Sequence, residues 1–327
     1  MLLVVGGAGY IGSHVVKELV EDNREVVVLD NLSTGHRWAV DERAIFIEGD
    51  MADSKLLQKV FEIYNIEAVL HFAASSLVGE SVINPIKYYE NNVSSTLTLL
   101  KVMKENKIDK FIFSSSAAVY GIPSVDIIDE NTLTNPINPY GKSKLMVEQI
   151  VEDFHYSYGL KYVTLRYFNA AGAYKTGEIG EYHNPETHLI PLVLEHLLGK
   201  KSSISIYGND YNTKDGTCIR DYIHVTDLAR AHVLALNAVL NEEVTNAIFN
   251  LGNGNGYSVK EIIDTCEIIT GIKPIVKLDK RRIGDPDVLV ANSKKILKEL
   301  GWKATIDIED IIKSAWNWHK SILVKRK

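Results

Sequence analysis

Cysteine is scarce in this chain: Cys218 and Cys266 are the two among 327 residues. The two cysteines lie far apart in the sequence and do not follow the spacing of a metal site. We therefore expect two reduced structural thiols, a cytoplasmic protein and no metal site.

Long apolar runs and a basic excess are also missing. No apolar stretch approaches the ~18 residues of a membrane helix, and an apolar strand beginning at Leu2 leaves no space for a secretion signal. The net charge is −6, whereas nucleic-acid-binding proteins usually carry a basic patch. Neither a membrane nor a nucleic acid is an expected partner. A hydrophobic content of 46% in 327 residues predicts one large domain or two closely packed ones.

A glycine-rich segment is the first positive signal. Leu2–Val5 predicts a buried parallel strand, and Gly6, Gly9 and Gly12 follow it before a helical stretch. Glycines at such a turn let the backbone approach a pyrophosphate, to which the helix N-terminus offers N–H groups. A second apolar run ends at Asp30, 18 residues beyond Gly12. An acid at this spacing is typical of adenosine-ribose binding and repels a 2′-phosphate, so the pattern predicts NAD rather than NADP.

Alternating strand and helix patterns predict an α/β fold with a Rossmann-type doubly wound parallel sheet. We expect an NAD-binding domain over residues 1–170, with returning segments near 220–245, and a smaller, interwoven α/β substrate lobe over 171–327. The expected strands are 44–47, 68–72, 110–114 and 162–166, with short ones near 204–206, 247–251 and 274–278. The expected helices are 54–64, 89–106, 140–158, 188–198, 226–240, 258–270 and 307–322. The second of these helices places Val93, Leu97 and Leu100 on one face.

Tyr140 and Lys144 lie four residues apart, one helical turn, on the same face. Lowering the pKa of a tyrosine from about 10 to about 7 needs roughly 4 kcal/mol of preference for phenolate, and an ammonium ~4 Å away supplies about that much. The serine cluster 114–116 precedes them at the expected carboxyl end of a strand, where doubly wound sheets bind ligands. Taken alone, these serines can equally end a strand by bonding to its backbone. Together with Tyr140 and Lys144 they predict a proton-transfer site.

Eight stretches carry a family resemblance: GGAGYIGSH (6–14), LDNLS (29–33), VGES (78–81), YYENNV (88–93), FSSSAAVYG (113–121), PYGKSKLMVE (139–148), LRYFN (165–169) and RDYIHV (220–225). With these motifs the chain resembles the extended short-chain dehydrogenase/reductase family and, within it, the 4-epimerases of UDP-hexoses. The resemblance covers residues 1 to about 320. It implies NAD as a tightly bound cofactor, a UDP-hexose as substrate, and a homodimer formed through helices such as 89–106 and 140–158.

The resemblance also assigns site residues. The residues it places at NAD are Gly6, Gly9, Tyr10, Ile11, Gly12, Asp30, Asn31, Leu32, Ser33, Asp50, Met51, Phe72, Ala73, Ala74, Asn91, Ser114, Tyr140, Lys144 and Phe168. Those it places at the UDP-sugar are Ser116, Tyr140, Asn169, His188, Leu189, Ser205, Ile206, Tyr207, Arg220, Arg282, Asp285 and Leu289. The catalytic residues are Tyr140, Lys144 and Ser116. Two assignments have plain alternatives, because Arg282 can belong to a solvated basic turn and His188 can satisfy a structural hydrogen bond.

The implied reaction is the interconversion of UDP-galactose and UDP-glucose through transient oxidation at C4, a 4-keto sugar that turns over, and return of the hydride. Related dehydratases carry Asp-Glu directly after the catalytic Ser or Thr, and decarboxylating relatives carry a Glu there. This chain has Ala117 and Ala118, which carry no proton. A rival of another class is a non-catalytic NAD-sensing regulator, which has no need for Ser116, Tyr140 and Lys144 together.

Leu289 bears on the range of substrates. Some relatives have a bulky tyrosine at this position, which closes the pocket beside the 2-substituent of the sugar. Leucine is shorter and leaves room for an N-acetyl group. We therefore expect additional activity on UDP-GlcNAc and UDP-GalNAc.

Overall fold

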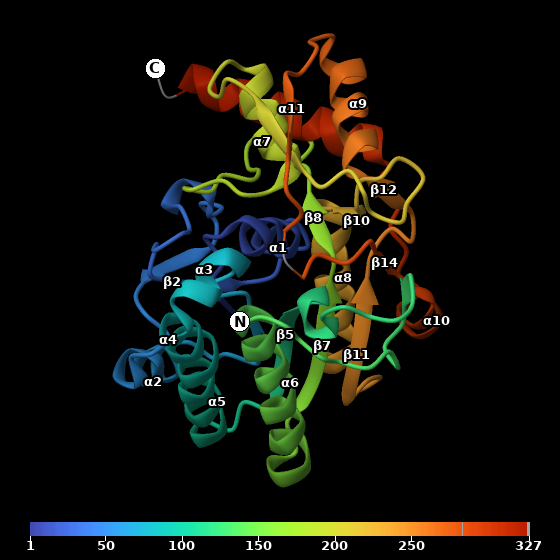
Figure 1. The fold of residues 1–327 in the computed structure, drawn as a ribbon. Helices are drawn as coiled ribbons and strands as arrows, with labels where there is room; N and C mark the ends of the chain where they lie inside the picture. Colours follow the sequence, from blue (N-terminus) through green and yellow to red (C-terminus); the bar gives the residue numbers. More distant parts are fainter. Residues whose placement is uncertain (283, 326–327) are drawn as a thin grey trace.

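Seven parallel strands form the main sheet in the computed structural model, which describes residues 1–282 and 284–325 (Figure 1). The strand order is β11-β7-β5-β4-β1-β2-β3. This arrangement confirms the predicted α/β class with its parallel sheet. The strands are β1 (Leu2–Val5), β2 (Val26–Asp30), β3 (Ile45–Glu48), β4 (Ala68–His71), β5 (Lys110–Ser116), β7 (Lys161–Tyr167) and β11 (Asn246–Leu251).

Side chains alternate between two cores, one on each face of this sheet. In β1, Leu2 and Val4 belong to the core under helices α1 and α8, whereas Leu3 and Val5 face the core under α2, α5 and α6. Because both faces are covered, β1 and β2 are apolar at nearly every position. The helices are α1 (Tyr10–Glu21), α2 (Ser54–Ile63), α5 (Ser95–Glu105), α6 (Pro139–Tyr158) and α8 (Val225–Leu240), with short turns η1 (Arg37–Ala39) and η3 (Ala117–Tyr120).

The helix expected over 89–106 is present, but it begins with a π-helical turn, and the prediction that Leu97 shares the buried face was wrong. The segment divides into α4 (Pro85–Tyr88), a π-helical turn η2 (Tyr89–Ser94) and α5, and a further helix, α3 (Val78–Ile83), precedes them. The wider π turn shifts the helix face, so Leu100 is buried and Val93 packs against the core while Leu97 is 44% exposed.

The second half of the chain builds smaller layers beside the main sheet. One mixed sheet joins β12 (Gly256–Ser258), β10 (Ile219–His224), β14 (Val288–Ala291) and β6 (Ile127–Ile128), with β8 (Asn169–Ala171) on β10. A pair of strands, β9 (Ile204–Tyr207) and β13 (Val276–Asp279), stands apart. Helices α7 (Leu189–Leu197), α9 (Val259–Thr270) and α11 (Ile308–Lys325) pack with these layers, whereas α10 (Lys294–Leu300) packs on β11 and α8 of the main core.

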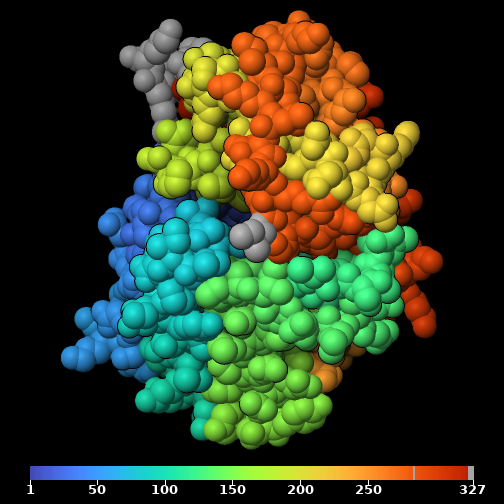
Figure 2. Space-filling view, in the orientation of Figure 1, coloured from blue at the N-terminus to red at the C-terminus, as the bar shows by residue number. Residues whose placement is uncertain are grey.

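The two halves are interwoven in the chain. Helix α8 packs on α1 and contributes to the main core, and β11 pairs with β7 at the edge of the main sheet. The return to the main sheet therefore extends past residue 245, while the division into an NAD-binding domain and a substrate lobe stays a prediction. Figure 2 shows the orange surface of the C-terminal third meeting the cyan and green surface of the first half.

Within the described ranges, every helix is too short or too polar to span a bilayer.

Candidate active site

The glycine loop connects β1 to α1 as the sequence predicts. Gly6 has φ +82°, and a Cβ on Gly12 would lie 2.3 Å from the Gly6 carbonyl oxygen, so both positions require glycine. Helix α1 begins after Gly9 without a side-chain cap. Gly9, Tyr10 and Ile11 are partly exposed, whereas the residues before them are buried. The exposed part of the loop is thus the start of a helix, where N–H groups are free to bind phosphate.

Asp30 lies at the carboxyl end of β2, beside this loop. Its carboxylate accepts hydrogen bonds from the N–H groups of Ala8 and Leu32 at 2.9 and 2.8 Å. Burial raises its pKa, against the effect of these two bonds. Asn31 follows and donates to Asp50 at 2.9 Å, at the end of the neighbouring strand. The structure therefore brings the predicted ribose-binding acid together with Asn31 and Asp50.

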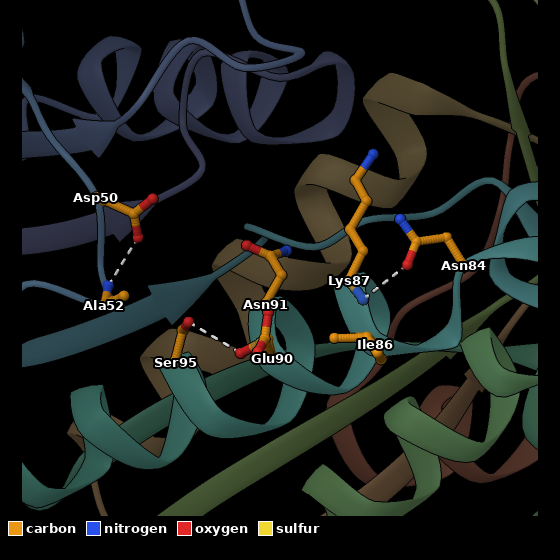
Figure 3. A pocket seen from close by; sticks show the side chains of 8 residues that line it. All are labelled: Asp50, Ala52, Asn84, Ile86, Lys87, Glu90, Asn91 and Ser95. Carbon is orange, nitrogen blue, oxygen red and sulfur yellow. Dashed lines mark hydrogen bonds between the residues drawn. The ribbon is translucent and has the colours of Figure 1, made fainter.

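A surface hollow contains Asp50 and a further predicted cofactor residue, Asn91 (Figure 3). It is lined by Asp50, Ala52, Asn84, Ile86, Lys87, Glu90, Asn91 and Ser95.

Three other predicted cofactor residues are not among those lining the hollow. Leu32 is half-buried and Ser33 is exposed, and the Ser33 N–H donates to the Asn31 side chain at 3.0 Å. Met51 differs from these residues, because its side chain is buried in the core under α2 and α5.

The loop after β4 holds Phe72, Ala73 and Ala74, all half-buried. The ring of Phe72 packs on His232, with centroids 4.9 Å apart. The next residue, Ser75, receives a hydrogen bond from Asn91 through its hydroxyl and donates its N–H to Asn92 at 2.8 Å. The π turn thus fastens this loop. Sequence analysis missed Asn92, which also bonds to Ser143 on α6.

Ser116 and Tyr140 meet at the carboxyl end of β5. Asn138 caps helix α6 by accepting from the Gly141 N–H at 2.9 Å, and Pro139 occupies its first turn. This start places Tyr140 near enough to Ser116 for the serine side chain to lower the pKa of the phenol. Tyr140 is half-buried, and Ser116 also accepts from the Ala118 N–H. A hydroxyl and a phenol therefore face one another where a parallel sheet binds its ligand.

Lys144 is buried one turn further along α6, on the same helix as Tyr140. Its ammonium donates to the Ser114 carbonyl oxygen at 2.7 Å, and burial lowers its pKa to about 7, against the opposing effect of Glu148. Burial raises the pKa of Tyr140, and Ser116 is the neighbour that lowers it. Burial thus disfavours the charged form of both groups, and the preparation of a phenolate by Lys144 together with an oxidised nicotinamide stays a prediction.

A buried polar network behind these residues was missed by sequence analysis. Glu148, one further turn along α6, forms an ion pair with Arg166 at 2.6 Å and accepts from the Ser115 hydroxyl at 2.5 Å. Arg166 also donates to the Tyr120 hydroxyl, which donates to Asn250 at 2.7 Å. The i, i+4, i+8 spacing of Tyr140, Lys144 and Glu148 was a usable signal. The network joins α6, β5 and β7 behind the catalytic pair.

The remaining residues beside the catalytic pair come from β5 and β7. Ser114 is buried and its hydroxyl bonds to the hydroxyl of Tyr167. Phe168 is buried in a small cluster with Ala117 and Val119, and Leu289 packs against this cluster. Asn169 is half-buried and begins β8, which pairs with β10. The predicted sugar-side residues Phe168, Asn169 and Leu289 therefore lie close to the end of β5.

Arg220 and Asp285 form an ion pair across the second half of the chain. Arg220 is nine-tenths buried on β10, and its partner in the register of β14 is Leu289. The Asp285 N–H donates to the Arg282 carbonyl oxygen at 3.3 Å. This backbone hydrogen bond connects Arg282 with the Arg220–Asp285 ion pair. Arg282 is exposed, with its guanidinium 4.3 Å from the ring centroid of Tyr207.

The last five predicted contacts lie in different surroundings. Ser205 is half-buried on β9, whereas the Ile206 side chain is buried in the core of the smaller layers and Tyr207 is exposed. His188 directly precedes α7, and Leu189 is its first residue. The Nδ1 atom of His188 faces Glu181 at 2.5 Å, so one side of its ring is already engaged.

The comparisons with known proteins agree over the whole chain. A model described as the NAD dependent epimerase/dehydratase family matches residues 2–252. A UDP-glucose 4-epimerase of Halalkalibacterium halodurans is 51% identical over 320 residues, which cover 98% of this chain and 95% of that protein.

Two solved structures extend this agreement to three dimensions. The UDP-glucose 4-epimerase from Bifidobacterium longum, in complex with NAD+ and UDP, has a TM-score of 0.93 at 41% identity and covers 98% of both chains. The UDP-Glc/GlcNAc 4-epimerase from Campylobacter jejuni has a TM-score of 0.86 at 42% identity, covering 98% of this chain and 99% of that chain.

Proposed function

Because this chain belongs to the NAD dependent epimerase/dehydratase family, we propose that it is an isomerase that interconverts UDP-galactose and UDP-glucose by inverting C4 of the hexose. The observation that carries this proposal is the meeting of Ser116 and Tyr140 at the end of β5, with buried Lys144 behind them.

The residues fit NAD as cofactor. The backbone approach at Gly6 and Gly12 leaves no room for a Cβ, and α1 begins there without a side-chain cap. Asp30 at the end of β2 fits ribose hydroxyls and disfavours a 2′-phosphate. When bound, NAD supplies the acceptor that takes hydride from C4 and later returns it. Asp50, Phe72, Ala73 and Asn91 are the further contacts that we assign to it.

Tyr140 is the proton acceptor in this mechanism. As the C4–H bond breaks, the phenolate oxygen takes the proton of the 4-hydroxyl and a 4-keto sugar forms. The Ser116 hydroxyl bonds to the same sugar oxygen and relays the proton. Arg220 and Arg282 hold the diphosphate, because the planar guanidinium group matches the geometry of phosphate oxygens. The 4-keto sugar can then rotate and present its other face while the UDP part stays bound. Tyr140 then returns the proton to the product alkoxide as hydride reaches the opposite face of C4.

Ala117 and Ala118 favour epimerisation over water elimination. They form the turn η3 directly after Ser116, and Ala117 is buried. A dehydratase needs an acid there to protonate the departing hydroxyl. Methyl groups cannot do so, and the keto sugar is left to be reduced again.

The direct test is to incubate purified protein with UDP-galactose and to quantify UDP-glucose by chromatography. We expect conversion to an equilibrium mixture while the absorbance of NADH stays flat, because the hydride leaves and returns within one active site. Steady accumulation of NADH would indicate a dehydrogenase, and a protein that binds NAD without converting any UDP-hexose would support the regulator.

We propose that the same site also accepts UDP-GlcNAc and UDP-GalNAc. Leu289 packs against the cluster that contains Phe168, next to the ion-paired Arg220. Its short side chain leaves space beside the 2-substituent of the sugar. Leu289→Tyr is expected to suppress turnover of the N-acetylated sugars while UDP-galactose turnover persists. Absence of UDP-GlcNAc turnover in the wild-type protein would exclude the idea.

We also propose a cytoplasmic homodimer. The exposed faces of α5 and α6 carry Leu97 at 44% and Met146 at 41% exposure, apolar surface that a second copy would cover. Both cysteines are free and buried, in keeping with a reducing compartment. Light scattering on the eluting protein should give twice the chain mass, and Leu97→Lys combined with Met146→Lys should give the monomer.

A further inference from the structure

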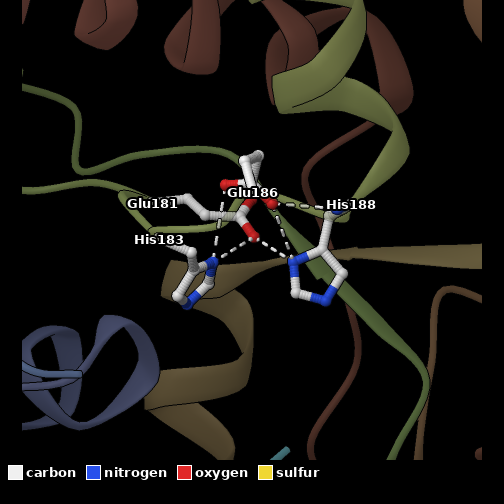
Figure 4. A group of neighbouring side chains, drawn as sticks. All are labelled: Glu181, His183, Glu186 and His188. Atoms are coloured by element: carbon white, nitrogen blue, oxygen red, sulfur yellow. Dashed lines mark hydrogen bonds and ion pairs between the residues drawn. The ribbon is translucent and has the colours of Figure 1, made fainter. Parts of the chain in front are cut away.

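Four metal-ligand side chains converge in the segment that precedes α7. Glu181, His183, Glu186 and His188 lie within eight residues of sequence. One ligand atom from each, a carboxylate oxygen or a ring nitrogen, lies within 4.8 Å of all the others. Figure 4 shows both carboxylates and both Nδ1 atoms pointing toward a common centre. Histidine and carboxylate ligands in such a group match zinc chemistry.

The distances from His183 to the two carboxylates are close to those within a coordination shell. With zinc–ligand bonds of ~2.0 Å, the edge of a tetrahedron is about 3.3 Å. His183 Nδ1 lies 3.4 Å from Glu181 Oε1 and 3.5 Å from Glu186 Oε2, close to that edge length. His188 Nδ1 lies closer to Glu181 Oε1, at 2.5 Å, and is 3.5 Å from the other Glu186 oxygen, Oε1. Binding an ion would therefore require His188 to move away from Glu181, while His183 already stands at shell distance from both carboxylates.

The hydrogen bonds around the cluster also suit a metal. Glu186 accepts the N–H groups of Thr187 and His188 through one oxygen, at 2.7 and 2.8 Å, which fixes the carboxylate and leaves its other oxygen toward His183. Trp318 donates to the Glu181 carbonyl oxygen at 2.8 Å. His183 Nδ1 is buried, yet in the described ranges it has no partner with hydrogen-bond geometry. Such outer contacts orient ligands in metal sites.

We propose that Glu181, His183, Glu186 and His188 bind one zinc ion. Two imidazole nitrogens favour zinc over magnesium or calcium, which prefer shells made of oxygen. The ion would fix residues 181–188 and therefore the start of α7, where His188 and Leu189 are placed. It is a structural ion, separate from the hydride and proton transfers. The sequence analysis, which considered cysteine spacing alone, expected no metal.

The alternative is an ion-pair cluster, in which two protonated histidines neutralise two carboxylates without a metal. Both arrangements use the same four side chains, so loss of stability in a variant does not distinguish them. Binding of the ion does. A zinc site gains its ion stoichiometrically and releases it to a strong chelator, and only it is stabilised by added zinc.

The test uses the full-length protein, stripped with a chelator and then titrated with Zn²⁺ alone against a chromophoric competitor. We expect one equivalent per chain, a rise in melting temperature on addition of Zn²⁺, and tetrahedral d–d bands when Co²⁺ is used instead. His183→Gln and Glu181→Gln should weaken Zn²⁺ binding by more than the roughly 10- to 100-fold expected for an outer-shell partner. Circular dichroism checks that each variant folds.

Glu178→Gln is the matched control, because Glu178 lies on the same loop, is exposed and pairs with Lys17. It should bind Zn²⁺ like the wild type. Glu186→Gln gives a third ligand variant should Glu181→Gln not fold. Wild-type protein that binds no equivalent of Zn²⁺, or ligand variants that bind it as tightly as the wild type, would overturn the proposal. Since the readouts are metal content and melting temperature, either outcome leaves the epimerase assignment untouched.

Discussion

The catalytic end of β5 and the loop segments of the smaller layers are built in opposite ways. Ser116 ends a strand, and Tyr140, Lys144 and Glu148 stand on successive turns of one capped helix. Residues 181–188, Arg282 and 284–289 lie on irregular backbone or at the ends of short elements instead. Regular elements give a catalytic pair its fixed geometry, whereas loops gather ligands that no sequence period connects.

The most severe test of the regular region removes the proton acceptor. Tyr140→Phe should lower kcat by roughly 10²- to 10⁴-fold, the usual contribution of a general base, while NAD stays bound because the ring keeps its place. Turnover of UDP-galactose and the NAD content of the purified variant measure the two effects. Tyr156→Phe, an exposed tyrosine on the same helix, is the control. Turnover equal to the wild type would refute the assigned role.

The network behind the catalytic pair provides the next test. Glu148→Gln keeps the shape but leaves Arg166 buried without its counter-charge, which should cost about 3 to 5 kcal/mol of unfolding free energy. Urea unfolding measures the loss. Glu152→Gln, one turn later and exposed, should change little. A loss in Glu148→Gln no larger than that of the control would mean that the network does not support the site.

Sequence predicted the first region because its rules are periodic. The parallel sheet can be inferred from an apolar strand, a glycine turn and an acid at the end of the next strand. Because ligands bind at the carboxyl ends of such strands, Ser116 can be chosen as a site residue from the sequence alone. The burial of Lys144 beside Tyr140 escaped prediction because spacing gives proximity and not burial. Leu97 escaped it because the π turn shifts the helix face. The cluster at 181–188 was missed because its ligands follow a loop.

Arg282 tests whether the loop region binds substrate or is a solvated basic turn. Arg282→Ala should raise KM for UDP-galactose roughly 10- to 100-fold, the loss expected when a charged hydrogen bond to the diphosphate is removed. Arg281→Ala is the matched control, since Arg281 is already paired with Asp210 and packs on Tyr211. Equal effects of the two substitutions would favour the solvated turn.

The smallest expected effect concerns His71 in the main sheet, whose protonation state is determined by burial. Thr96 donates its hydroxyl to the Asn92 carbonyl oxygen, so it accepts from Nε2 of His71, and Nδ1 is buried without a partner in the described residues. Burial, aided by Lys144, lowers the pKa of His71 to about 3.

The folded state therefore keeps His71 neutral while the unfolded chain protonates near pH 6.5. Its contribution to stability is complete above that pH and falls by up to about 1.4 kcal/mol for each pH unit below it, toward the folded pKa. Urea unfolding of wild type and His71→Gln at descending pH should show a steeper loss in the wild type. Equal slopes of unfolding free energy against pH in the two proteins would mean that the folded state also protonates His71, so that burial in the sheet does not keep the ring neutral.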